Sequence, residues 1–455
     1  MRRRWLIIFL LSFCSTSVFS QHKISVPLMD AIDEAIKNNT TARALIMLED
    51  QVDIARLDQQ LYAQKATVHE RAYIVITTLR EKARETQDAI FSFLASKSSD
   101  EVAEFYGLWV ANMIVVEAAP SLLFQLSERT DVAFLQLDGV LERDRPVSAT
   151  PSRSIPNGVE PGLRAINAHK MWEAGFTGDG VIVMNIDTGV DGNHPAFNYK
   201  WRGTHVPTWQ AWFDPNTNTT FPTDCDSHGS HTIGTMAGLE PATNDTIGVA
   251  IRAEWIAAKT LCAPGTHTSF SIAAFQWAMD PDSNAGTIDD MPIAIGNSWW
   301  DPNITGSTQC DPAQNPYINV IAAVEAVGIA VVFSAGNSGP GTSTITTPKN
   351  VNMDEVHFWA TGAVDGNNPS YPIASFSSRG PVISQCITGV PSLDIKPEAS
   401  APGVSVRSAV LSGNYGLKSG TSMACPHVVG ALALLKEAHP TRTGHELKMA
   451  LYNTA

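Results

Sequence analysis

The chain has 455 residues, of which 44% are hydrophobic and 32 are glycine, and its formal net charge is -14 at pH 7. This length predicts two or three folded units rather than one. The negative charge disfavours contact with a phosphate backbone, so we do not expect nucleic acid as a partner.

The first 20 residues form a distinct segment, MRRRWLIIFLLSFCSTSVFS. Three arginines precede an apolar run, and Val18 and Ser20 are placed for cleavage. This pattern is typical of a secretory signal peptide and is too short for a stable membrane anchor. We therefore expect a secreted, extracellular protein that has no membrane contact after residues 1–20 are removed.

Secretion permits disulfides, and the cysteines set limits on them. Loss of Cys14 with the signal leaves Cys225, Cys262, Cys310, Cys386 and Cys425. An odd number leaves at least one of these free or paired outside the chain. Cys425 lies in an apolar helical stretch, where a small buried thiol is the plain interpretation. The other four allow three pairings, and their spacing does not choose among them.

Residues 21–146 differ in composition from the rest of the chain. The stretch 51–94 has helix-like spacing and contains no glycine or proline. A strand is expected over 108–118, then a helix that begins at Pro120, then a strand in DVAFLQLDGV. This order predicts a small α+β domain. The following residues 147–161 belong to a stretch with four prolines, RPVSATPSRSIPNGVEPG, and predict an exposed, cleavable linker.

From residue 162 to 455, predicted strands alternate with predicted helices. Apolar runs such as VIVMNI and IAVVFS are separated by helical segments such as HGSHTIGTMAG and YINVIAAVEAV. Continuous apolar strands are typical of a parallel sheet covered on both faces. We expect an α/β fold with a doubly wound, mostly parallel sheet. Ligands of such sheets bind beyond the carboxyl ends of the strands, so polar residues there are the candidates.

Four polar residues stand at suitable positions, and each has a structural alternative. Asp187 follows a strand and could be a turn residue or helix cap. His228 opens a helix and, with His231, could suggest a metal site, but no third ligand pattern accompanies them. Asn337 could be a left-handed turn residue, and Ser422, in SGTSMACPHVVG, could be a helix cap.

Taken together, the same residues supply every part of a nucleophilic hydrolase. A serine hydroxyl needs a neighbouring base, and a histidine base needs a carboxylate to fix its tautomer. An asparagine amide and the serine N–H can stabilise the oxyanion of a tetrahedral intermediate. Because an acid and a histidine precede Ser422, an α/β-hydrolase esterase, whose acid and histidine follow the serine, is rejected.

Six sequence blocks in order resemble those of the subtilisin-like serine proteases, with bacillopeptidase F-like enzymes as the nearest group. They are VMNIDTGVDGNHP, DSHGSHTIGTMAG, SAGNSGPG, ASFSSRGP, SAPGVSVRSA and SGTSMACPHVVG. The resemblance covers residues 162–455 and implies a serine endopeptidase that cleaves proteins or peptides through an acyl-enzyme. The chain ends abruptly in LKMALYNTA, and this leaves open whether it belongs to a longer parent protein.

The resemblance also assigns roles. Asp187 would orient the imidazole, and His228 would act as base and then acid. Ser422 would be the nucleophile, and Asn337 the oxyanion donor. Residues 21–146 are similar to the family's propeptide, so we expect an inhibited zymogen that matures to a monomer. A catalytically inert binding protein on the same scaffold is the alternative, but such a protein would be expected to have lost a triad member, and none is missing.

The sequence departs from the family pattern in the substrate-pairing strand and at the family's calcium site. The substrate-pairing strand has Ser298, Trp299 and Trp300, where the family commonly has glycine at the third position, so the cleft should be reshaped. No cofactor is implied as required. The family's tight calcium site uses a carboxylate where this chain has Ala196, so we do not expect that site. The loop EPATNDTIG leaves Ca²⁺ binding open, although a solvated loop is favoured.

The fold that the resemblance implies bears on the disulfides as well. The loops that carry Cys225 and Cys262 would border the same edge of the cleft, so we expect these two residues to be bridged. Cys310 and Cys386 would then form the remaining pair.

Overall fold

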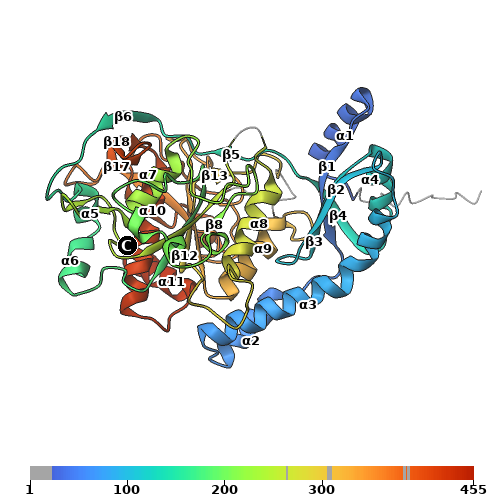
Figure 1. The fold of residues 1–455 in the computed structure, drawn as a ribbon, viewed down its shortest axis with the longest axis horizontal. Helices are drawn as coiled ribbons and strands as arrows, with labels where there is room; N and C mark the ends of the chain where they lie inside the picture. Colours follow the sequence, from blue (N-terminus) through green and yellow to red (C-terminus); the bar gives the residue numbers. More distant parts are fainter. Residues whose placement is uncertain (1–22, 263–264, 305–309, 383–385, 387–389) are drawn as a thin grey trace, which may run out of the picture.

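The computed structural model describes residues 23–455 except 263–264, 305–309, 383–385 and 387–389. The expected signal peptide, residues 1–20, lies outside the described residues. Figure 1 shows a small unit of blue and cyan elements beside a larger body that holds the rest of the chain. None of the helices in the described part of the chain is long and apolar enough to cross a membrane.

The smaller unit is an α+β sandwich with a core of its own. Its sheet has the order β2-β3-β1-β4, and every pair for which a register is resolved is antiparallel. Apolar side chains of the sheet and of the helices α1 and α4 bury one another, as Leu28, Ile46 and Leu135 illustrate. The elements are α1 Val26–Asn38, β1 Ala42–Leu48, α2 Ile54–Ala63, α3 Val68–Ala95, β2 Val102–Leu108, β3 Met113–Ala118, α4 Pro120–Ser127 and β4 Val132–Leu137.

Two local expectations for this unit need correction. The helical stretch 51–94 is two helices, because Lys65 has a left-handed backbone and Thr67 caps α3 in a capping box with Glu70. The strand expected over 108–118 begins only at Met113. Before it the chain turns at Asn112, which has φ 40° and donates its side-chain amide to the Asp50 carbonyl at 2.7 Å.

The larger body is an α/β domain, as the alternating pattern predicted. Its seven-stranded sheet has the order β16-β15-β14-β12-β7-β11-β8, and all neighbouring strands are parallel. Helices α7 and α10 cover one face, and α8 and α9 cover the face toward the smaller unit (Figure 1). The strands are β7 Ile182–Asp187, β8 Trp212–Phe213, β11 Glu254–Lys259, β12 Ala294–Asn297, β14 Ala330–Ser334, β15 Ala360–Val364 and β16 Ala399–Pro402. The main helices are α7 His228–Ala237, α8 Thr268–Met279, α9 Pro316–Ala326, α10 Thr421–Ala438 and α11 Gly444–Thr454.

Shorter elements complete the domain. They are β5 Glu142–Arg143, β6 Ser148–Ser152, α5 Pro161–Ala165, α6 Ala168–Glu173, β9 Leu239–Glu240, β10 Asp245–Thr246, β13 Trp299–Trp300, β17 Val406–Val410 and β18 Asn414–Ser419. Short 3-10 helices cover Asn198–Lys200, Arg202–Thr204, Thr208–Gln210 and Pro391–Asp394. The segment expected as a linker is largely exposed, but its β6 pairs antiparallel with β18 and so has a fixed path.

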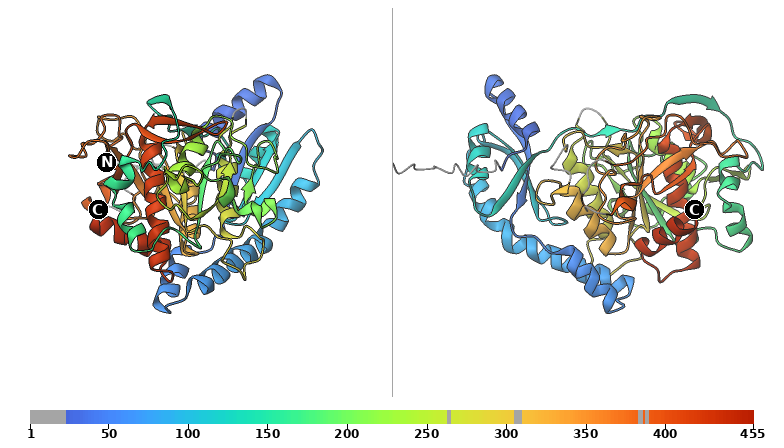
Figure 2. Two further views of the ribbon diagram at one scale, coloured as in Figure 1. Left: turned by 60° about the vertical axis from the view of Figure 1, so that its left-hand side comes forward. Right: turned by 180° about the vertical axis from the view of Figure 1, so that it is seen from behind.

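The smaller unit contacts the α/β domain at the ends of α8 and α9. The Asp138 carboxylate accepts hydrogen bonds from the Ser269 N–H and hydroxyl, both at 2.7 Å, in the first turn of α8. A carboxylate at a helix N-terminus is favourable because of the free N–H groups and the helix dipole. Arg43 donates to the same carboxylate at 2.6 Å, and Arg71 donates to the Ala326 carbonyl at the end of α9 at 3.0 Å. Figure 2 shows the two bodies in contact from two further sides.

Cys425 is the free cysteine of the described residues, and it lies buried in α10. Its thiol faces the carbonyl of Val332 at 3.6 Å, and burial raises its pKa to about 12. This matches the small buried thiol expected from the sequence.

We predict that Cys425 resists iodoacetamide in the native protein at about pH 8, because alkylation requires the thiolate and access. After denaturation without reductant the same thiol should react. Mass spectrometry of the Cys425 peptide before and after denaturation provides the measurement. Rapid labelling of the native protein at Cys425 would contradict this packing.

Candidate active site

Asp187 and His228 meet at the carboxyl edge of the sheet. Asp187 is the last residue of β7, and His228 is the first residue of α7. The Nδ1 atom of His228 lies 2.8 Å from Asp187 Oδ1 and 3.0 Å from Oδ2, and both side chains are buried. The Nε2 atom of His228 is buried and has no hydrogen-bond partner among the described residues. The carboxylate therefore holds one nitrogen, and the other is available to a reacting group.

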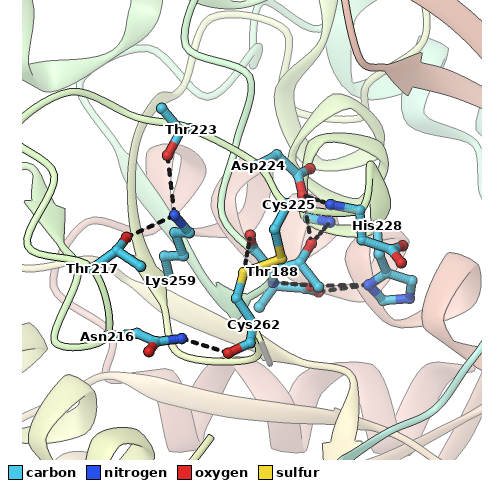
Figure 3. Close-up of a disulfide and its surroundings, with 12 residues drawn as sticks. Thr188, Asn216, Thr217, Thr223, Asp224, Cys225, His228, Lys259 and Cys262 are labelled. Carbon is cyan, nitrogen blue, oxygen red and sulfur yellow. Dashed lines mark hydrogen bonds and ion pairs between the residues drawn. A yellow bond between two sulfur atoms is a disulfide. The ribbon is translucent and has the colours of Figure 1, made fainter. Parts of the chain in front are cut away.

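Asp224 positions His228 by tying the start of α7 to the loop after β7. One Asp224 oxygen accepts hydrogen bonds from the Ser230 N–H at 2.8 Å and hydroxyl at 2.6 Å. Its other oxygen accepts from the Thr188 hydroxyl at 2.8 Å, and that hydroxyl accepts from the Gly229 N–H at 2.9 Å. Figure 3 shows Thr188 and Asp224 beside the His228 backbone. Sequence analysis missed this role, because Asp224 lies two residues before the block that contains His228.

A disulfide joins Cys225 to Cys262 next to this network. The S–S distance is 2.05 Å and the Cα atoms are 6.2 Å apart. The Cys225 N–H donates to the Thr188 carbonyl at 3.2 Å, so the bridge borders the turn that follows Asp187 (Figure 3). The structure also joins Cys310 to Cys386. The first bridge is the one that the resemblance implied, and the second is the pair that then remained.

Ser422 and Asn337 lie together at the start of α10. Asn337 Oδ1 accepts hydrogen bonds from the Thr421 N–H at 2.8 Å and hydroxyl at 3.0 Å, which fixes the direction of its amide. Asn337 Nδ2 then donates to the carbonyl of Arg145 at 2.9 Å. The Ser422 hydroxyl donates to the carbonyl of Asp144 at 2.6 Å. As the second residue of the helix, Ser422 has a backbone N–H without an intrahelical acceptor.

The chain's own residues 142–147 run across these side chains. Strand β5 pairs antiparallel with β13, so that Arg143 faces Trp299. The Asp144 N–H continues this pairing by donating to the Ser298 carbonyl at 3.0 Å, and Val147 N–H donates to the Ser419 carbonyl at 2.8 Å. The predicted substrate-binding strand therefore carries an extended segment of the same chain.

The two tryptophans of that strand differ in their surroundings. Trp299 is buried, and its ring packs against Phe275, Tyr317 and Phe333. Trp300 is half-buried and is paired through its backbone with Glu142. The first ring therefore belongs to the core, whereas the second remains partly exposed.

A cavity of about 300 Å³ adjoins His228, and charged side chains line it. Arg143 forms an ion pair with Asp226 at 3.0 Å. Burial opposes ionisation of Asp226, but the hydrogen bond and charge of Arg143 outweigh it and lower the pKa of that carboxyl. Burial also lowers the pKa of Lys418, against the pull of nearby carboxylates.

His231 is a structural residue and not a partner of His228 in a metal site. Its Nε2 atom lies 3.1 Å from the Val406 carbonyl and 3.2 Å from the Gly416 carbonyl. Burial lowers the pKa of His231 well below its usual value, so the ring stays neutral and joins α7 to the strands β17 and β18.

Metal-binding capacity lies away from these residues. Within the described ranges, two groups of side chains could hold a cation: Glu325, His357 and His445, and Asp280, Asp282 and Asp290. In the loop considered for Ca²⁺, Glu240 accepts a hydrogen bond from the Tyr415 hydroxyl, and Asp245 forms an ion pair with Arg407. Both loop carboxylates therefore already have protein partners.

Sequence analysis missed one charged group beneath the cleft. Lys349 is fully buried, and its ammonium pairs with the Asp144 carboxylate. The Ser334 hydroxyl, at the end of β14, donates to the same carboxylate oxygen at 2.6 Å. Lys349 stands in TTPKNV, where no motif marks it.

Comparison with known proteins agrees with this arrangement. The model of the subtilase family matches residues 178–455. Bacillopeptidase F of Bacillus subtilis (strain 168) is 32% identical over 416 residues, which are 86% of this chain and 27% of that protein. Subtilisin E of the same organism is 30% identical over 380 residues, 82% of this chain and 83% of that protein. An alkaline protease of Shouchella clausii is 32% identical over 377 residues, 81% of this chain and 84% of that protein.

This chain thus spans about a quarter of bacillopeptidase F but most of the length of the subtilisins. Catalysis in subtilases requires no cofactor. The parallel sheet, the residues gathered at its carboxyl edge and the family match over more than half of the sequence lead to one conclusion: the chain belongs to the subtilase family and contains its serine-type endopeptidase domain.

Proposed function

We propose that this protein is a secreted serine endopeptidase that uses Asp187, His228 and Ser422 and is made as a zymogen inhibited by residues 21–146. The observation that carries the proposal is the path of residues 142–147. They pair with the substrate-binding strand, and one of their carbonyl oxygens accepts the hydrogen bond of the Ser422 hydroxyl. A peptide substrate would need the same contacts.

The proposed reaction has two halves. Ser422 Oγ attacks the carbonyl carbon of the bound peptide while His228 Nε2 takes its proton, and Asp187 holds the opposite nitrogen. Asn337 and the Ser422 N–H stabilise the negative oxygen that forms. His228 then protonates the leaving amine, and water hydrolyses the acyl-enzyme in the same manner.

Inhibition follows from the same contacts. The smaller unit is anchored at α8 and α9, and its C-terminal tail fills the cleft. A substrate cannot enter while that tail is bound, so residues 21–146 act as a tethered competitor. The signal-like residues 1–20 and the two disulfides support export to an oxidising compartment. An inert binding protein on this scaffold is less well supported, because every residue of the proposed machinery is present.

For Ser422→Ala we predict an unprocessed precursor, no labelling by a fluorophosphonate and loss of peptide hydrolysis. In subtilisin, a relative, removal of the serine lowers kcat about 10⁶-fold. Ser370→Ala, which removes an exposed loop hydroxyl, is the matched control and should behave as wild type. Processing and labelling of pure Ser422→Ala protein would refute the assignment of Ser422 as the nucleophile. Wild-type protein that is neither processed nor labelled would instead favour the inert scaffold.

For Asn337→Leu we predict a lower kcat with a nearly unchanged KM, because the amide acts on the oxyanion more than on the ground state. Loss of one such donor in subtilisin costs about 10²–10³-fold. Steady-state kinetics with one peptide substrate provide the comparison, after active-site titration corrects for misfolded protein. Equal kcat in variant and wild type would show that other groups bind the oxyanion.

We predict that residues 21–146, added as a separate polypeptide, inhibit the mature enzyme competitively. The reason is that the unit has its own core and docks through side chains that the cleavage would not remove. A segment that ends at Leu141 and so lacks β5 is the control, and it should inhibit more weakly. Undiminished hydrolysis in a large molar excess of residues 21–146 would leave this unit as a spacer.

A further inference from the structure

In the segment 142–147 that lies in the cleft, the contacts mark the peptide bond after Asp144 as a candidate for cleavage. Its N–H donates to the Ser298 carbonyl at 3.0 Å, and its own carbonyl oxygen is the one that contacts the Ser422 hydroxyl. The residue whose carbonyl is attacked is called P1. Asn337 donates to the next carbonyl, that of Arg145, so cleavage after Arg145 is the competing possibility. The two possibilities differ in which side chain is enclosed.

The Asp144 side chain is enclosed, whereas that of Arg145 is exposed. The carboxylate of Asp144 accepts hydrogen bonds from Ser334 and from Lys349, which also donates to the Trp299 carbonyl at 3.2 Å. Gly336 also borders the pocket: a β-carbon there would stand at an ordinary contact distance, 3.7 Å, from the other Asp144 oxygen. The enclosing groups all come from the endopeptidase domain.

Lys349 makes this pocket unusual in charge. A fully buried ammonium is costly unless a counter-ion and hydrogen bonds compensate it. Burial lowers the pKa of Lys349, and the Asp144 carboxylate opposes that shift. Across the described residues, Asp144 is the carboxylate that forms an ion pair with Lys349. Because Asp144 lies in the segment proposed to leave on maturation, the mature pocket would present a positive charge without its partner.

We propose that Lys349, with Ser334, forms the base of a primary specificity pocket that selects acidic P1 residues, and that the precursor is cut between Asp144 and Arg145. This inference rests on the proposed endopeptidase function. In the cut, Ser422 Oγ bonds to the Asp144 carbonyl carbon and the bond to Arg145 breaks. Arg145 leaves as an amine with a proton from His228. Water then supplies the hydroxyl that releases Asp144 as a carboxylate and returns a proton to Ser422.

A charge at the base of a pocket sets P1 preference in other serine proteases, where a buried carboxylate selects basic residues. In this protein the charge in the pocket is positive, so the selected P1 residue would be negative. A charge-assisted hydrogen bond is worth enough to give about a 10- to 100-fold preference for the matching substrate. An uncharged P1 residue would leave the Lys349 ammonium without a partner.

The first test is the P1 profile of the mature wild-type enzyme. Peptide 4-nitroanilides that differ only at P1, with Asp, Glu, Phe or Lys, are compared by kcat/KM. We expect Asp or Glu to exceed Phe by about tenfold or more. A higher kcat/KM for Phe or Lys than for both acidic residues would overturn the inference. This test does not depend on the folding of any variant.

The second test changes the charge. Lys349→Met should lower kcat/KM for the P1 Asp or Glu peptide by about 10- to 100-fold and leave or raise that for P1 Phe. Lys170→Met removes an exposed lysine of α6 and should not alter the profile. Active-site titration with a fluorophosphonate corrects each preparation. An acidic preference retained in Lys349→Met would overturn the role of this lysine.

The third test locates the cut. Mass spectrometry of the released N-terminal fragment should find Asp144 as its last residue, and any other end would contradict the assignment. Failure of the proposed function looks different from failure of this inference. If the wild type takes up no fluorophosphonate and cleaves none of the four peptides, both the endopeptidase function and the acidic specificity are refuted. If the enzyme is labelled but prefers a non-acidic P1 residue, only the specificity proposal is refuted.

Discussion

The antiparallel pairing of residues 142–143 with residues 299–300 is the interaction on which the arrangement of the cleft depends. Side chains alternate along a strand, so a shift by one residue would exchange the enclosed and the exposed side chains. The pairing seen here places Asp144 over Lys349 and its carbonyl against Ser422. Backbone pairing and the buried ion pair therefore specify the same register, and each makes slippage of the other unfavourable.

The parallel sheet explains why residues distant in sequence share this edge. Asp187 ends β7 and Asn337 follows β14, and the carboxyl ends of these two strands point the same way on either side of β12. Helices α7 and α10 begin at that edge and bring His228 and Ser422 with them. Local hydrogen bonds then set the directions: Asp224 holds the start of α7, and Thr421 fixes the amide of Asn337 at the start of α10. The order of the strands therefore brings these side chains close together, and the hydrogen bonds at the helix starts orient them.

Two carboxylates join the N-terminal unit to the endopeptidase domain, one at the start of α8 and one beside Lys349. Asp138 lies at the N-terminus of α8 and is paired with Arg43, and Asp144 is paired with Lys349. Removing either partner would leave a buried charge uncompensated, which is strongly unfavourable. These contacts favour one docked orientation over the many that apolar surfaces alone would permit. They would also survive hydrolysis of the bond after Asp144, because both carboxylates remain on the N-terminal fragment.

The sequence by itself determined the α/β class, because buried parallel strands are apolar runs, and it marked Asp187, His228, Asn337 and Ser422, because each stands in a local block. It also held the signal for the break before α3: the capping box that begins at Thr67 marks a helix start although no glycine or proline precedes it in this stretch. Only the tertiary structure decided the path of residues 142–147 and the partner of Lys349. That lysine lies 205 positions from Asp144, and Ser422 lies 278 positions from the same residue. Contacts over such separations leave no periodic or local pattern, since they arise only when the sheet and the docked unit bring the segments together.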